Sequence, residues 1–94
     1  MIVRIATEGQ YELGGEALAR LDEADNALLE AVEAGDEEAF RRELGRVLEL
    51  VRQLGRRLGD GELRESDLIL PPPDMTLAEA RQLLSGYPRD LLDR

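Results

Sequence analysis

Two long stretches of the chain carry apolar residues at helical spacing. In residues 36–58 these positions are separated by 4, 3, 4, 3 and 4 residues, and they are Phe40, Leu44, Val47, Val51, Leu54 and Leu58. In residues 16–34 they are Leu18, Leu21, Leu28 and Val32, with alanines beside them. This periodicity predicts two amphipathic helices, from about Glu16 to Ala34 and from Asp36 to about Leu58.

Gly35 and Asp36 separate the two helices. Glycine is the usual residue just past the end of a helix, and aspartate is a preferred N-cap at the start of the next one. Because this connection is so short, the two helices must lie side by side in opposite directions. The sequence therefore predicts a long antiparallel helical hairpin.

The segments that flank the hairpin have the character of strands. Residues 1–6 (MIVRIA) are apolar and partly β-branched, and a second short run follows at residues 11–13. We expect a tight β-hairpin between them, with Gly9 at positive φ. An isolated pair of strands is marginally stable, so Leu68–Leu70 is predicted to add a third strand.

Three consecutive prolines, Pro71–Pro73, follow this third strand. We interpret them as a stiff connector, with a ligand for an aromatic-lined groove as the alternative. Thr76 and Glu79 then form a T-x-x-E capping box, which predicts a short helix through Leu84 that stops at Gly86.

The expected fold class is α+β. It consists of a small N-terminal β-hairpin plus a third strand, a long antiparallel helical hairpin and a short C-terminal helix. Residues 1–86 are expected to form one domain and residues 87–94 a C-terminal tail. The chain has 94 residues, of which 43% are hydrophobic and only 3% aromatic. We therefore expect a single core built from aliphatic side chains.

The formal charge of −9 narrows the choice of partners. It argues against a nucleic acid, because phosphate contacts need clustered basic residues, and against adsorption to an anionic membrane. It suits docking onto a basic protein surface. No window approaches the roughly 20 apolar residues of a membrane span, and no signal peptide is recognisable. We expect a cytoplasmic protein that does not insert into the membrane.

The residue types that usually carry catalysis are scarce. The sequence contains no cysteine, histidine or lysine, so it lacks a thiolate, an imidazole base and an amine nucleophile. We expect no catalytic residues, no cofactor, no metal ligands and no enzymatic activity. Abundant carboxylates leave an acid/base or metal-dependent module as an alternative, although Asp22, Glu23 and Asp25 do not follow the loop pattern of an EF-hand.

The second helix has more apolar surface than its hairpin partner needs, so part of it is expected to bind another helix. Asp25 interrupts the apolar stripe of the first helix. It lies either at the margin of that stripe or in a polar contact across a helix interface. The candidate interaction surface therefore consists of Asp25, Leu48, Val51, Arg52 and Leu54.

Several stretches of the sequence resemble the PspA-associated protein family, PspAA. They begin with MIVRI and EGQY in residues 1–11, continue with LLEAV, Gly35-Asp36 and Phe40, and include SDLILPPPDMTL in residues 66–77. Together they extend from residue 1 to about residue 86, in a fairly specific order and spacing.

The resemblance implies a small partner of PspA, the coiled-coil protein of the phage-shock envelope-stress response. It implies no activity, so no catalytic residue is carried over. An adaptor or regulator that binds PspA, through the helical hairpin or through the exposed edge of the sheet, is accordingly our first functional hypothesis. The alternative is a homodimer in which two helical hairpins pack into a four-helix arrangement without a role specific to PspA.

Overall fold

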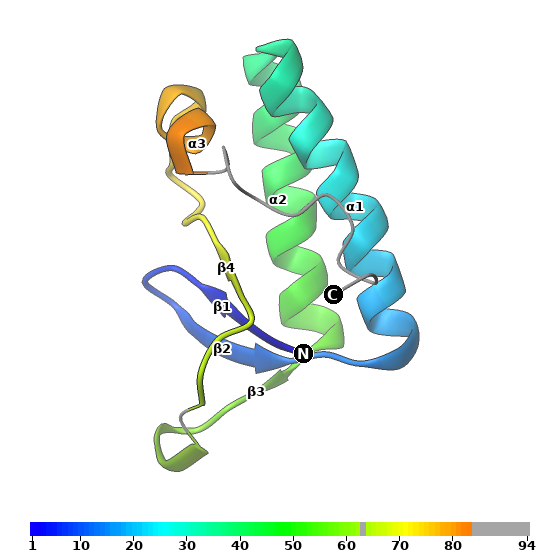
Figure 1. The fold of residues 1–94 in the computed structure, drawn as a ribbon, viewed down its shortest axis with the longest axis vertical. Coiled ribbons are helices and arrows are strands. Elements are labelled where there is room, and N and C mark those ends of the chain that lie inside the picture. The colour runs from blue at the N-terminus through cyan, green and yellow to red at the C-terminus, as the bar shows by residue number, and fades with distance from the viewer. Residues whose placement is uncertain (63, 84–94) are drawn as a thin grey trace.

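The computed structural model describes residues 1–62 and 64–83 and shows an α+β fold (Figure 1). The order of elements is β1 (Ile2–Ile5), β2 (Gly9–Glu12), α1 (Gly15–Ala34), α2 (Glu37–Leu54), β3 (Arg56–Arg57), the 3-10 turn η1 (Asp60–Glu62), β4 (Leu68–Leu70) and α3 (Leu77–Leu83). The strands form one mixed sheet in the order β3-β2-β1-β4. The sheet and α3 lie on the same side of two long helices (Figure 1).

The helical hairpin is confirmed, and the turn between its helices has the predicted chemistry. Gly35 has φ 70°, and its backbone N–H donates to the carbonyl groups of Ala31 and Val32. The Asp36 carboxylate accepts a hydrogen bond from the backbone N–H of Ala39 at 3.0 Å. The left-handed glycine closes α1 and the aspartate opens α2, so the chain reverses within two residues.

The predicted end of the second helix is wrong, because α2 stops at Leu54 and not near Leu58. Gly55 packs against the sheet so closely that an added Cβ would lie 2.7 Å from the Val51 carbonyl oxygen and 3.0 Å from Tyr11 Cβ. The chain leaves the helix here and forms β3, which pairs with β2. Leu58 is buried, but not as part of a helix.

The sheet has four strands where the sequence predicted three. The β1–β2 hairpin is antiparallel, with Val3 opposite Tyr11 and Ile5 opposite Gly9. Gly9 has the expected positive φ, at 152°, but Thr7 in the turn also has a positive φ, at 69°. The predicted third strand is confirmed as β4, which lies parallel to β1 at the edge of the sheet.

The C-terminal part of the described chain connects the sheet to the far end of the hairpin (Figure 1). Pro71 is fully buried, which supports the interpretation of the prolines as a packed connector. The capping box is confirmed, since Thr76 and Glu79 exchange backbone-to-side-chain hydrogen bonds of 3.1 Å. Leu84, Gly86 and the predicted tail 87–94 lie outside the described residues, so the domain boundary at residue 86 stays a prediction.

One aliphatic core lies between the sheet and the helical hairpin. Alternate strand residues point into it, among them Val3, Ile5, Tyr11, Leu68 and Leu70. The helices contribute their apolar faces: Leu21, Ala24, Leu28, Leu29, Ala31 and Val32 from α1, and Phe40, Leu44, Val47, Leu48 and Val51 from α2. Arg4 and Ile69 are neighbours on the opposite face of the sheet. Among the described residues, no helix has the length and apolar character to span a membrane.

Candidate interaction surfaces

The structure divides the five residues of the predicted interaction surface into two groups. Asp25, Leu48 and Val51 are buried, with at most 1% of their surface exposed. Leu54 is 40% exposed, and Arg52 is partly exposed. The predicted interaction surface is therefore corrected at Asp25, Leu48 and Val51, because the sheet covers much of the apolar face that the sequence left available for a partner. Leu54 and Arg52 remain as accessible candidates.

Asp25 does not lie at the margin of the apolar stripe, as one interpretation held. It is 1% exposed and lies on the buried face of α1 with Leu21 and Leu28. The polar contact across a helix interface stays a prediction. Burying a carboxyl group at such a position carries a large desolvation cost, which an apolar side chain in the same place would not have.

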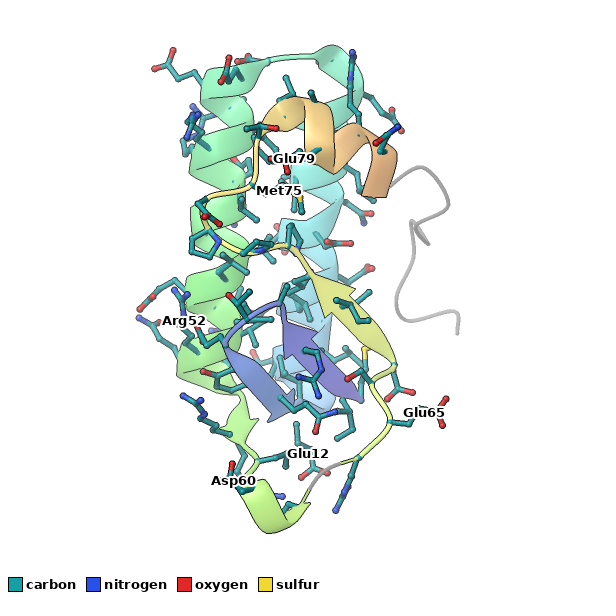
Figure 2. The ribbon with its side chains drawn as sticks, turned by 90° about the vertical axis from the view of Figure 1, so that its left-hand side faces the viewer. Glu12, Arg52, Asp60, Glu65, Met75 and Glu79 are labelled. Atoms are coloured by element: carbon teal, nitrogen blue, oxygen red, sulfur yellow. The ribbon has the colours of Figure 1, made fainter. Side chains whose placement is uncertain are left out.

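Arg52 connects α2 to the turn of the β1–β2 hairpin (Figure 2). Its guanidinium makes a forked contact with the Glu8 carboxylate, with N–O distances of 2.7 and 3.0 Å. The Tyr11 hydroxyl donates a further hydrogen bond of 2.7 Å to Glu8. The hydrogen bonds from Arg52 and then from Tyr11 lower the pKa of Glu8 from 4.5 to about 2. These hydrogen bonds to Glu8 therefore hold the turn of the β1–β2 hairpin against α2.

Leu54 lies in a shallow groove between the first turns of α1 and the last turns of α2. One part has a volume of about 320 Å³ and includes Arg20, Arg46, Leu50 and Leu54. A second part of about 160 Å³ shares Arg20 and Leu54 and adds Glu16 and Ala17. We call this surface the hairpin groove. Its floor is aliphatic and its rim is charged, the usual character of a site for an amphipathic helix.

An acidic ridge extends along α1 from the hairpin groove. Glu16, Glu23 and Glu30 are all exposed and are spaced seven residues apart, so they share one face of the helix. Glu16 pairs with Arg20 at 3.3 Å. Within residues 1–62 and 64–83, no ion pair is formed by Glu23 or Glu30. The ridge therefore presents two uncompensated carboxylates to solvent.

The described residues define an α+β domain whose most prominent surface is a grooved, acidic helical hairpin. They contain no group of three carboxylates arranged to hold a metal ion. A family model described as PspA-Associated protein (PspAA) matches residues 1–91, and the chain belongs to that family. This match extends beyond residue 86, where the resemblance seen in the sequence ended. No curated protein and no solved structure matches the chain.

Proposed function

We propose that this protein is a non-catalytic adaptor that binds PspA in the envelope-stress response. The family match carries the proposal, since the family is described by its association with PspA. The binding site proposed is the hairpin groove together with the acidic ridge. The aliphatic floor at Leu50 and Leu54 supplies apolar contact, and the ridge supplies negative charge.

The shape and charge of this surface favour one kind of partner segment. A helix laid into the groove would place apolar side chains at intervals of three or four residues onto Leu50 and Leu54. Basic residues on the flank of the same helix would face Glu23 and Glu30. Opposite charges of this kind accelerate encounter and set the orientation of the partner.

A binding titration with PspA from the same source tests the proposal. Leu54 and Ile69 are the two large hydrophobic side chains with high exposure among the described residues, at 40% and 53%. Leu54→Asp is expected to weaken binding by about tenfold or more, because it places a charge in a desolvated contact. Ile69→Asp is the matched control and should leave affinity unchanged. Equal affinities for the two variants, or no binding by the unmodified protein, would contradict the proposal.

A homodimer is the second candidate function, and the rim of the hairpin groove favours it. Arg20 and Arg46 lie there with Glu16 and Glu49, so two copies related by a two-fold axis can match opposite charges. Sedimentation separates the two candidates. A strict monomer at high protein concentration would contradict the homodimer, whereas a complex with PspA should form and should weaken as added salt screens the acidic ridge.

A further inference from the structure

The face of the helical hairpin that the sheet leaves uncovered carries a column of polar side chains on each helix (Figure 1). Members of a column are three, four or seven residues apart, so they share one face of their helix, and all of them are exposed. The hairpin groove, with Leu50 and Leu54 on its floor, lies between the two columns. The column of α1 consists of Glu16, Arg20, Glu23 and Glu30, and that of α2 consists of Arg42, Arg46, Glu49 and Gln53.

The two columns carry uncompensated charge of opposite sign. On α1, neither Glu23 nor Glu30 forms an ion pair within the described part of the chain. On α2, Arg42 and Arg46 share a single carboxylate, that of Glu43, at N–O distances of 3.4 and 3.5 Å. The side chain of Glu43 is only 14% exposed, whereas those of Arg42 and Arg46 are 67% and 56% exposed. The face of α1 is therefore locally negative, and the first half of α2 is locally positive.

The tight turn between α1 and α2 determines which residues of the two helices lie at the same height. Residues equally far from the turn are level, as Ala17 and Leu54 show by lining the same part of the hairpin groove. Three pairs of opposite charge are level to within about one or two residues, or about 1.5–3 Å of helical rise, and they are Arg20 with Glu49, Glu23 with Arg46 and Glu30 with Arg42. Read from the far end, the column of α2 is therefore the charge complement of the column of α1.

We propose that a second copy of this chain occupies the hairpin groove, related to the first by a two-fold axis parallel to α1 and α2. Such an axis places α1 of one copy against α2 of its partner at the same height, so each of the three charge pairs forms twice across the interface. A two-fold axis perpendicular to the helices would instead place one acidic ridge against the other, and like charges disfavour that arrangement. The result is a four-helix arrangement in which neighbouring helices are antiparallel.

The interface is small, so the dimer is weak. Helices of 20 and 18 residues, about 27–30 Å long and about 10 Å wide, offer about 500–600 Å² on each copy. The total of about 1,000–1,200 Å² is at the lower end for specific interfaces, and we expect a dissociation constant of about 10–100 μM. This inference rests on the second candidate function and adds a regulation of the first, because a dimer that covers the hairpin groove excludes PspA until it dissociates.

Two charge-reversed variants test the proposed axis by sedimentation equilibrium. One combines Glu23→Arg with Glu30→Arg, and the other combines Arg42→Glu with Arg46→Glu. Each should raise the dissociation constant of its own homodimer at least about tenfold, because like charges then face each other. An equimolar mixture of the two should form a heterodimer about as tightly as the unmodified chain associates, since every reversed column then meets the opposite charge. The first variant is less negative than the unmodified chain, so long-range repulsion alone would predict tighter association for it.

Arg41→Glu is the matched control. Arg41 is an exposed arginine of α2 that lies outside the column and pairs with Glu37 at 3.3 Å, so its reversal should leave the dissociation constant unchanged. Circular dichroism of each variant checks that the helices are intact. If the double arginine variant does not fold, the single exchanges Glu23→Arg and Arg46→Glu repeat the mixing experiment with a smaller change.

Three results would overturn the proposal. They are a strict monomer of the unmodified chain at about 1 mM, unweakened association of the variant with a reversed acidic ridge, and a mixture of the two variants that associates no more tightly than either alone. None of these measurements contains PspA. The dimer and the PspA complex can therefore fail separately.

Discussion

The helical hairpin and the four-stranded sheet are stabilised by contacts of different range along the chain. At the hairpin turn, the decisive hydrogen bonds join residues three or four positions apart, from Gly35 to Ala31 and Val32 and from Ala39 to Asp36. In the sheet, the Asp67 carboxylate accepts from the Ile2 backbone N–H at 2.8 Å across 65 positions of sequence. The hairpin is therefore a local structure, and the sheet is assembled from distant segments.

Buried polar groups hold those distant segments together. Gln10 is 3% exposed, and its amide group donates to Ser66 Oγ at 2.9 Å and to the Arg64 carbonyl, while it accepts from the Arg64 N–H at 3.2 Å. Each of these contacts forms only when β2 and the segment that leads into β4 have come together. Single changes at the sheet should therefore cost more stability than equivalent changes in the helical hairpin, where the stabilisation from apolar packing is distributed over many residues.

Gly55→Ala should have the largest effect, because Gly55 joins the two regions. The new Cβ would meet a backbone oxygen at 2.7 Å and the side chains of Tyr11 and Leu13 at 3.0 and 3.1 Å, so α2 or β2 must move. We expect a loss of about 2–4 kcal/mol in unfolding free energy, measured by urea denaturation. Gly45→Ala is the control inside α2, where an added Cβ meets nothing within 4 Å. It should gain about 1 kcal/mol.

Gln10→Ala should be the next largest change. It leaves the Arg64 N–H and the Arg64 carbonyl without their partner at a partly buried site, and we expect a cost of about 2 kcal/mol. Gln53→Ala is the matched control, since Gln53 is exposed and its side chain bonds to Glu49 within the same helix. Similar losses for both variants in urea denaturation would contradict the view that the sheet depends on single buried contacts.

The range of the contacts also explains how much of the fold could be predicted. Caps, apolar periodicity and the T-x-x-E box involve neighbours in sequence, so α1, the turn at Gly35 and the start of α3 follow from them. Strand β3 could not be found, because Arg56 and Arg57 carry no strand signal and pair with β2 only after Gly55 has ended α2.

The candidate site was predictable to a smaller extent. A heptad pattern shows that Leu48 and Val51 are apolar and share a face, but it does not show that a sheet will cover that face. The Glu8–Arg52 pair joins residues 44 positions apart, so no local sequence pattern predicts it. Leu54 was identified because it continues the seam, and its exposure follows from the early end of α2.

The Glu8–Arg52 pair makes the stability of the sheet depend on pH. The pKa of Glu8 falls from 4.5 to about 2 on folding, because the hydrogen bond from Arg52 favours the ionised form. Its stabilisation is therefore fully present above pH 4.5 and is lost as the pH falls towards 2. With the partial exposure of both side chains, we expect a loss of about 1–2 kcal/mol. Glu8→Gln should flatten this part of the profile in denaturation curves from pH 7 to pH 2. A profile identical to that of the unmodified protein would contradict the assignment.

Thr7→Gly should produce the smallest change, and in the opposite direction. Glycine adopts φ 69° without the steric cost that a β-branched residue carries, but it also has more freedom to lose on folding. The net expectation is a gain of about 0.5 kcal/mol in thermal or urea unfolding. Gly9→Ala is the paired test, since its Cβ would press on Arg57, and it should lose stability. If Thr7→Gly destabilises the protein, the backbone at the tip of the β1–β2 hairpin is not strained. The sheet then differs from the helical hairpin only in the range of its contacts.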